Sequence, residues 1–463
     1  MDHIVLGIDF GTTNSCMSYY RDNEFKIIPN EQGEFLTRSC ISVGDTETSF
    51  GNVAINGISN LKRDVNGYRE LIQEYIGYLK RCATEFIGTE VKEVVITVPV
   101  YYDHNQRSII KECFEQNGFV VLRIINEPTA AALAYTWRFK GAGGGVGACK
   151  GVGASEETVL VVDCGGGTTD ISLMHLDYQT LVYTVKQVTG DNHLGGEDLT
   201  NILVDHFSKR LNIVPNAELF RACEKLKHEL SFRENTQLIF ESTGKMISVS
   251  RSQFEMICSP FFQRIQQLVS EINRDLYTKV IFVGGTTRIP YFKKLFNDKT
   301  IYSELDPDQT VAIGAAVQGA LIRDLFDSDN EFGESLLLDI TNFSLGIEVE
   351  NGLMSKIVSK NTPLPVSRTR DFVNADNDTE IEIHVYQGER KFAKDNVFLA
   401  KFNLKFNEII QEKTHVISVT FDIDLNGIIT VSARARDTEI ENSIELQMCQ
   451  TGSIENLDEI FGI

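Results

Sequence analysis

The stretches VLGIDFGTTNS at residues 5–15 and VLVVDCGGGTTD at residues 159–170 decide the fold of this chain, and the second nearly repeats the first. Each begins with an apolar run that predicts a buried strand, continues with an Asp and ends in a turn of Gly and Thr. Backbone N–H groups in such a turn bind phosphate oxygens, and an Asp at the strand end holds a metal ion through water. Two tight hairpins are the alternative, since Gly also supplies their backbone angles. The repeated Asp placement favours two phosphate turns around one nucleotide.

The composition predicts a soluble globular protein. The 463 residues are enough for about three domains, and 42% of them are hydrophobic. A net charge of −21 argues against nucleic-acid binding through phosphate neutralisation, and no apolar run of about 18 residues could span a membrane. The first strand follows the N-terminus too closely for a signal peptide, so we expect a cytoplasmic protein.

The cysteines predict reduced thiols. There are nine, an odd number without a CxxC pair, which argues against a disulfide framework or a zinc site. Cys16 and Cys164 flank the phosphate turns and are candidates for redox sensitivity.

A third glycine turn extends the candidate nucleotide site. Residues 279–296 read as a strand, a turn at Gly284 and Gly285, and an amphipathic helix. The turn lets a ring or a ribose approach the backbone, and Arg288 could cover a purine face. No GxxxxGK[ST] motif occurs, which excludes a P-loop enzyme.

Two helices are further candidates. Gly195 and Gly196 precede a helical run from Glu197, and a helix N-terminus favours a phosphate. Glu224 and Lys227 lie on one face of a later helix, as does Ser231, a spacing that by itself is typical of a solvated face.

Several segments, in the same order and spacing, resemble the ATPase domain of DnaK-type 70-kDa heat shock proteins. They are IDFGTTNS, ITVPVYYDHNQR, IINEPTAAALAY, VDCGGGTTD, GDNHLGGED, FVGGTTRIP and DPDQTVAIGAAVQGA, and the resemblance runs from residue 4 to about residue 445. It implies an α/β, actin-like ATPase domain of two lobes, each with a ribonuclease-H-like core, with ATP and Mg²⁺ between the lobes. The repeated phosphate turn would be the trace of that duplication.

The resemblance also implies a metal and nucleotide site. Asp9, Asp163 and Asp170 would hold a hydrated Mg²⁺ or accompanying monovalent cations such as K⁺, mostly through water. From the residues alone, each carboxylate could instead cap its turn. The residues implied to bind ATP or ADP are Gly11, Thr12, Thr13, Asn14, Gly165, Gly166, Gly167, Thr168, Gly195, Gly196, Glu197, Glu224, Lys227, His228, Ser231, Gly284, Gly285, Arg288, Ile289 and Asp308.

The implied catalytic set is Lys62, Glu127, Asp163 and Thr168. Phosphoryl transfer needs a cation that offsets negative charge while a water is held in line, and the family carries it in a Lys-Arg pair. Lys62 is the first candidate here and Arg63 the second. Glu127 would help to position the water, although an acid there could also cap the Ala-rich helix that follows.

The chain is predicted to continue into a second domain. We assign residues 1–325 to the nucleotide-binding domain, 326–339 to an acidic and then hydrophobic linker, 340–450 to an all-β sandwich and 451–463 to a short tail without a helical lid. Residues 335–339 resemble the interdomain linker of the family, and a first strand of the sandwich is the alternative. Asn426-Gly427 predicts a type I′ hairpin. A sandwich of this kind suits extended peptides.

Three departures from the family pattern bear on function. The stretch around Lys62 is short, so most of a small subdomain that caps one lobe is expected to be missing. His228 stands where the family has an Arg that stacks on adenine, and an imidazole can still stack. Glu350 replaces a small or apolar residue of the peptide arch, where a carboxylate is costly to desolvate unless it faces water.

These features favour an ATP-dependent chaperone that hydrolyses ATP weakly and binds unfolded or extended polypeptides transiently. The resemblance implies a J-domain co-chaperone and a nucleotide exchange factor as partners. A regulatory or scaffold protein of the same family with little ATPase activity is the alternative, and a sugar or acid kinase on the same core is a third. Intact Asp9, Glu127, Asp163 and Thr168 favour the chaperone, whereas the missing subdomain and lid favour the scaffold.

Overall fold

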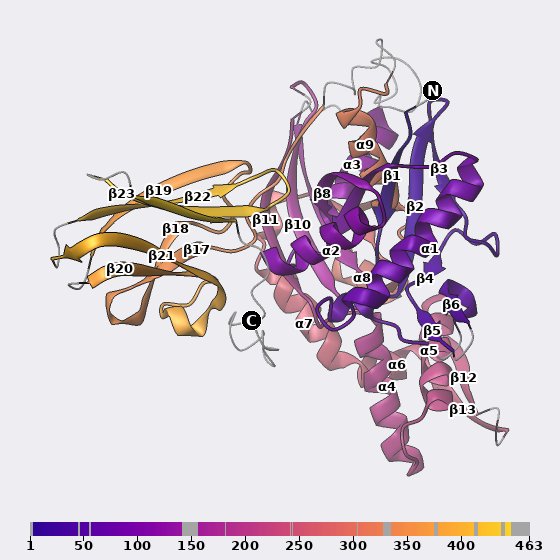
Figure 1. Ribbon diagram of the computed structural model, residues 1–463. Coiled ribbons are helices and arrows are strands. Elements are labelled where there is room, and N and C mark those ends of the chain that lie inside the picture. The colour runs from indigo at the N-terminus through magenta and orange to yellow at the C-terminus, as the bar shows by residue number, and fades with distance from the viewer. Residues whose placement is uncertain are drawn as a thin grey trace. The chain divides into compact units, whose positions relative to one another are not determined.

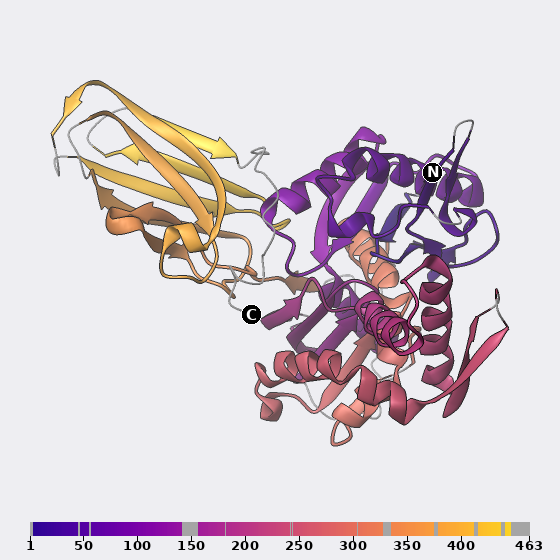
Figure 2. The same ribbon diagram turned by 90° about the horizontal axis from the view of Figure 1, so that it is seen from below.

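The computed structural model describes most of the chain and divides into two compact units (Figures 1 and 2). One unit comprises Met1–Tyr101 and Cys113–Leu337, and the other comprises Tyr102–Glu112 and Leu338–Ile463. The described residues are 3–44, 47–54, 57–140, 156–180, 182–240, 242, 244–302, 304–326, 335–374, 378–411, 415–436 and 440–445. The predicted tail 451–463 and the acidic part of the linker, 327–334, lie outside them.

The first unit contains two sheets of similar construction. In the first, β1 pairs antiparallel with β2 and parallel with β7, and in the second β9 pairs antiparallel with β10 and parallel with β14. The first sheet has the order β3-β2-β1-β7-β8, with β4 against β2: Glu24–Ile28, Asn14–Arg21, Val5–Asp9, Glu93–Val98, Val120–Asn126 and Thr37–Arg38. The second has the order β15-β14-β9-β10-β11-β16: Thr300–Tyr302, Lys279–Val283, Glu156–Cys164, Thr169–Asp177, Val182–Asp191 and Leu336–Leu338. The sheets therefore confirm the predicted duplication.

Two helices of small residues connect the sheets. Helix α3 (Glu127–Lys140) contacts strands of both sheets and packs on α9 (Thr310–Ile322), which lies against β1. A Cβ at Gly314 would come within 1.7 Å of the Ala130 carbonyl oxygen, so the α3–α9 contact requires glycine there. The Ala-rich sequences of both helices follow from this close approach, which fixes the strand ends that carry the two phosphate turns.

The remaining elements of the first unit surround this core. Helices α1 and α2 are Arg69–Ile87 and His104–Gln116, with the start of α2 belonging to the second unit. Helices α4 to α8 are, in order, Gly196–Leu211, Ala217–Phe232, Arg251–Ile257, Ser259–Ser270 and Pro290–Leu295. The hairpin strands are β5 (Ile41–Val43) with β6 (Thr48–Phe50) and β12 (Asn235–Phe240) with β13 (Lys245–Ser250). The 3₁₀ turns η1 to η4 are Gly51–Val53, Leu61–Arg63, Arg274–Leu276 and Gly285–Arg288. None of the helices in the described ranges is both long and apolar enough to cross a membrane.

The second unit contains the predicted β-sandwich. Its apolar core includes Val385 and Leu404 from one sheet and Phe421 and Val431 from the other, all fully buried, as the period-two alternation of these strands requires. Glu350, in the turn η6 (Glu350–Gly352), is exposed. One sheet has the order β18-β17-β20-β21, and its strands are, in that order, Leu353–Val358, Leu345–Val349, Asp378–Gln387 and Val397–Ile410. The other has the order β19-β22-β23-β24, and its strands are Val366–Val373, Val416–Ile423, Ile429–Ala435 and Glu441–Glu445. The 3₁₀ turn η7 is Ala393–Asp395.

The prediction of a type I′ turn at Asn426-Gly427 is wrong. Gly427 has a positive φ of 75°, but Asn426 does not, and type I′ requires both. The Gly427 N–H donates to the Asp424 carbonyl oxygen, and the Asp424 carboxylate accepts from the N–H groups of Asn426 and Ile428 at 2.8 Å. These side-chain bonds stabilise a turn that starts at Asp424 with glycine at its last position.

The apolar part of the predicted linker forms an edge strand. Strand β16 pairs with β11, and Leu337 is 2% exposed whereas Leu336 is 50% exposed. The Arg123 guanidinium donates to the Leu337 carbonyl oxygen at 3.5 Å and to Gln318 of α9 at 3.2 Å. One leucine of this segment is thus packed into the first unit, and its backbone is bound to the same sheet system as the phosphate turns.

Candidate nucleotide site

A pocket of about 430 Å³ lies where β1 and β9 end. Most of the residues predicted from the sequence line it, namely Asp9, Gly11, Thr12, Thr13, Asn14, Lys62, Glu127, Asp163, Gly165, Gly166, Thr168, Gly196, Glu197, Glu224, Lys227, His228, Ser231, Gly284, Gly285, Arg288, Ile289 and Asp308. Three predicted residues, Gly167, Gly195 and Asp170, are not part of the lining, but each adjoins a residue that is. The structure therefore brings residues more than 250 positions apart in the sequence into one cavity.

The two phosphate turns touch each other. A Cβ at Gly166 would meet the Thr13 hydroxyl at 1.8 Å, and a Cβ at Gly167 would meet the Thr12 side chain at 2.6 Å. Glycine is required in the second turn because threonines of the first turn occupy that space. The backbone N–H groups of both turns consequently remain close enough together to surround one phosphate chain.

Buried carboxylates accumulate at the ends of the strands. Asp163 lies opposite Asp170 in the β9–β10 register, and Thr97 donates to Asp9 at 3.3 Å. Burial, and next the charge of Glu127, raise the pKa of Asp9 to about 7. The pKa of Asp163 is raised well above its ordinary value, mainly by burial and next by the charges of Glu127 and Asp170. Such mutually repelling, desolvated carboxylates favour a cation beside them.

The donor set fits a hydrated metal ion. Oxygen ligands suit Mg²⁺, which keeps several waters and usually binds one or two carboxylates together with substrate phosphates. Within the described ranges, no three His, Cys, Asp or Glu side chains are arranged to hold one ion directly. Asp9 and Asp163 would therefore contact the ion mainly through its waters, with Asp170 adding charge from behind.

Lys62 and Glu127 form a buried ion pair in the pocket. Lys62, on the 3₁₀ turn Leu61–Arg63, is 3% exposed, and its Nζ lies 2.5 Å from the Glu127 Oε1. Glu127 is the first residue of α3, so its carboxylate also lies at a helix N-terminus. The arrangement places one cation and one potential water-orienting carboxylate beside Asp9 and Asp163.

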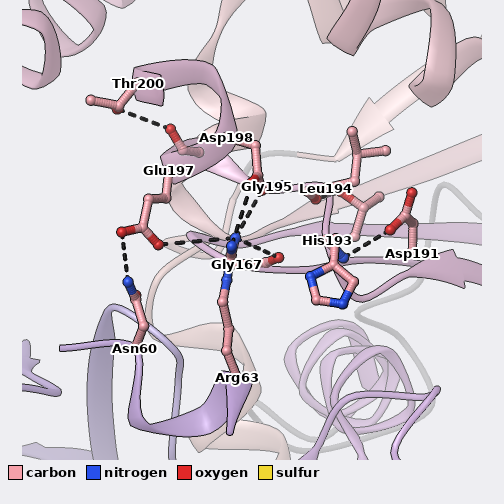
Figure 3. A network of polar contacts seen from close by, with 12 residues as sticks. Asn60, Arg63, Gly167, Asp191, His193, Leu194, Gly195, Glu197, Asp198 and Thr200 are labelled. Atoms are coloured by element: carbon pink, nitrogen blue, oxygen red, sulfur yellow. Dashed lines mark hydrogen bonds and ion pairs between the residues drawn. The ribbon is translucent and has the colours of Figure 1, made fainter. Parts of the chain in front are cut away.

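The segment Asn60–Arg63, here named the strap, connects the two lobes (Figure 3). The Arg63 guanidinium donates to both carboxylate oxygens of Asp198, at 2.8 and 3.4 Å, and to the Gly167 carbonyl oxygen at 3.2 Å. The Asn60 amide donates to Glu197 at 2.6 Å. Glu197 and Asp198 form the first turn of α4, so the strap holds this helix start against the second phosphate turn.

One face of α5 and the third glycine turn form a further part of the pocket wall. Lys227 is buried, and its Nζ donates to the Gly196 carbonyl oxygen at 2.7 Å, which contradicts the expectation of a solvated face at this residue. Arg288 donates to Asp306 and Asp308, both at 2.7 Å. Burial in this wall, and next the charge of Lys227, lower the pKa of His228, so its imidazole is neutral at pH 7.

Thr286 is a pocket residue that the sequence interpretation missed. Its hydroxyl donates to the Gly165 carbonyl oxygen at 2.7 Å and so joins the third glycine turn to the second phosphate turn. The GGTT order of this turn, which repeats the Gly-Thr pairing of the first, was the available signal. Other lining residues that were missed are Leu36, Arg38, Ser59, Asn60, Phe220, Phe232, Val283, Pro307 and Val311.

The expectation of redox-sensitive thiols beside the turns is not supported. Cys16 and Cys164 are buried, and burial raises the pKa of the Cys164 thiol to about 12 and that of Cys16 further. A buried, protonated thiol is a poor nucleophile and reacts slowly with oxidants. Both residues are therefore packing residues of the strands.

Comparison with known proteins decides the family. The family model described as Hsp70 protein matches residues 5–74 and 68–461. The chain belongs to the Hsp70 family. It is 34% identical to a heat shock 70 kDa protein of Neurospora crassa, over 95% of this chain and 77% of that protein, and 33% identical to heat shock cognate 70 kDa protein 3 of Dictyostelium discoideum, over 94% and 78%.

Membership in the Hsp70 family explains both units. The first corresponds to the actin-like, nucleotide-binding domain of the family and the second to its β-sandwich domain, so the predicted fold and a chaperone role are confirmed. The individual roles of Lys62, Glu127 and the other site residues remain predictions, as do the domain limits drawn from the sequence.

Proposed function

We propose that this Hsp70 protein binds ATP with Mg²⁺ in the pocket and hydrolyses it slowly. The observation that supports this most strongly is the buried Lys62–Glu127 pair beside Asp9 and Asp163 at the ends of the duplicated strands. Glu127 would orient the attacking water, because its carboxylate lies in the pocket and is itself held by Lys62. A bound Mg²⁺ would neutralise phosphate charge.

The phosphate tail would be bound by main chain rather than by long side chains. The turns at Gly11–Asn14 and Gly165–Thr168 supply N–H and hydroxyl donors from two sides, and Lys62 supplies the positive charge. Such fixed donors need little rearrangement as charge develops during phosphoryl transfer. The position of Lys62 in a buried ion pair keeps its ammonium group in place.

We further propose that nucleotide is coupled to transient binding of unfolded or extended polypeptides by the sandwich. Strand β16 supports this, because Leu337 is packed in the first unit while the chain continues directly into the second. A ligand shifts such an arrangement only when it binds one state more tightly than another. A J-domain co-chaperone and an exchange factor would act on this cycle, in the cytosol.

Protease protection of the linker tests this coupling. We expect ATP, but not ADP, to protect Leu336–Leu338, and Leu337→Asp to abolish the difference without preventing ATP binding. The exposed neighbour offers a matched control, since Leu336→Asp places the same charge where it remains in water. Equal protection in the nucleotide-free, ADP and ATP forms, with peptide affinity indifferent to nucleotide, would refute the coupling.

The second candidate function is a scaffold in which nucleotide only fixes conformation. The strap favours it, because Asn60 and Arg63 already join the lobes through protein contacts. Single-turnover ATP hydrolysis with and without an unfolded peptide separates the two functions. A slow rate that peptide raises supports the chaperone cycle, whereas the absence of turnover despite tight ATP binding supports the scaffold.

A further inference from the structure

Phe232 is an exposed aromatic residue on the wall of the nucleotide pocket. It is the last residue of α5 and is 75% exposed, although it lines the cavity. The leucines of this helix behave differently, since Leu219, Leu226 and Leu230 are buried in the core. An apolar ring in this position buries little of its surface in the protein and is available to a ligand in the pocket.

Phe232 lies one helical turn after His228, on the same side of α5. Both residues line the pocket, as does Phe220 at the start of the helix. His228 is neutral at pH 7, so its ring offers a face without charge. The α5 wall thus presents two flat side chains at adjacent positions, a spacing that suits a planar ligand group.

Lys227 and Arg288, two cations that line the same pocket, are already bound. The Lys227 Nζ donates to Gly196 and to the Thr200 hydroxyl at 2.9 Å, and the Arg288 guanidinium is held by Asp306 and Asp308. Their positions are therefore set by the protein. A planar group entering this end of the pocket would meet the phenyl and imidazole rings of α5 on the helix side.

We propose that Phe232 stacks on the nucleobase and, with His228, determines how this protein holds the base. This inference rests on the proposed nucleotide binding. The phosphate turns line the same cavity as His228 and Phe232, so a nucleotide held by its phosphates can bring its base to the rings of α5. Stacking on an aromatic ring tolerates any base, because every base has a π-face. Phe232 therefore contributes affinity for the base more than selectivity among bases.

The test compares a ligand that has a base with one that lacks it. ADP and inorganic pyrophosphate are titrated by calorimetry into the full chain and into Phe232→Ala, Phe232→Trp and Phe232→Leu. We expect Phe232→Ala to weaken ADP about fivefold or more and to leave pyrophosphate unchanged, as base stacking predicts. Phe232→Trp should retain ADP affinity, whereas Phe232→Leu, which keeps apolar bulk but no ring, should lose part of it.

A spectroscopic signature and a control complete the experiment. Etheno-ADP, whose emission falls when its base stacks, should be quenched by the unaltered chain and much less by Phe232→Ala. Met256→Ala removes a side chain that is equally exposed, at 74%, from outside the pocket lining and should change nothing.

The outcomes separate this inference from the proposed function. Unchanged ADP affinity in Phe232→Ala, in a chain that binds ADP, overturns the stacking role alone. Equal losses for ADP and pyrophosphate also overturn it, because they indicate a structural role for Phe232. Failure of the unaltered chain to bind either ligand refutes the nucleotide site itself, and the stacking role with it.

Discussion

The part of the pocket proposed to hold the phosphates and the part proposed to hold the base, here named the phosphate end and the base end, are built by different means. At the phosphate end, two backbone turns touch each other, and glycines are required because threonines or another backbone segment occupy the neighbouring space. At the base end, the wall is a helix face with a largely accessible ring at Phe232 and a polar ring at His228. An atom added at Gly166, Gly167 or Gly195 should therefore displace the turns, whereas the base end should respond gradually to substitution.

The largest expected effect follows from adding one carbon at the phosphate end. A Cβ at Gly195 would come within 2.5 Å of the Gly166 and Gly167 backbone, so the second phosphate turn must move. We expect Gly195→Ala to weaken ADP binding about a hundredfold, equivalent to about 2.7 kcal/mol. Calorimetric titration of ADP measures this loss.

Gly33→Ala is the matched control. Gly33 has a φ of 79°, and a Cβ added to it would meet no neighbouring side chain or backbone within 4 Å. Alanine there should cost about 1 kcal/mol of stability through backbone strain and leave ADP affinity unchanged. An ADP affinity of Gly195→Ala within about threefold of the original would show that the phosphate end is not rigid, and the contrast between the two ends would disappear.

The next effect concerns chemistry at the same end. Lys62→Ala should slow single-turnover ATP hydrolysis at least about tenfold, or about 1.4 kcal/mol in the barrier, with nearly unchanged ADP affinity. The reason is that Lys62 is the buried cation beside Glu127. Because Glu127 would be left as an unpaired buried charge, the unfolding free energy of Lys62→Ala is measured beside the rate, and a slow rate in a chain that remains folded at the assay temperature excludes lost stability as its cause. An unaltered rate in Lys62→Ala would transfer the role to Arg63.

The phosphate end could be predicted almost completely from the sequence. Its residues belong to short contiguous motifs in which an apolar strand, an Asp and a Gly/Thr turn follow one another, so the local chain dictates the geometry. Asp9 and Asp163 could be placed at strand ends from periodicity, and the strands are where the sequence puts them. What periodicity could not supply was the contact between turns, because Thr13 and Gly166 meet only through the packing of the two sheets.

The base end and the strap could be predicted only in part. Helix spacing places Glu224, Lys227 and Ser231 on one face but does not tell a solvated face from a pocket wall, because both are polar. Phe232 has no periodic signal at the end of a helix. The Arg63–Asp198 contact joins residues 135 positions apart, and no local pattern encodes it.

The third prediction sharpens the comparison by loosening the strap. Arg63→Ala removes the paired hydrogen bonds to Asp198, which are partly exposed, so the loss should be modest and ADP should dissociate about three- to fivefold faster. Stopped-flow displacement of a fluorescent ADP analogue gives the rate. Arg63→Lys should restore part of the effect, since it keeps the charge without the two parallel bonds.

A surface pair provides the control for the strap. Lys26→Ala breaks the exposed Lys26–Asp22 pair of 2.7 Å and should leave ADP dissociation unchanged. If Arg63→Ala also leaves the rate of ADP dissociation unchanged, the strap does not restrain the lobes. Nucleotide retention then depends on the phosphate turns alone.

The smallest expected effect is a pH dependence at the base end. Since the pKa of His228 is lowered on folding, the unfolded chain binds a proton more readily between that lowered value and about 6.5, the ordinary value for histidine. The stabilising contribution is therefore fully present above about pH 6.5 and is lost as the pH falls through the folded value. His228→Asn should flatten the pH dependence of the unfolding free energy below about pH 6.5, and the effect should be small because the ring is partly in contact with water. Denaturant titrations of both proteins across this range measure the difference, with equal slopes above about pH 7 as the internal control. If the two proteins have identical slopes of unfolding free energy against pH below about pH 6.5, burial and the charge of Lys227 do not lower the pKa of the imidazole. The base end would then be as open to solvent at His228 as it is at Phe232.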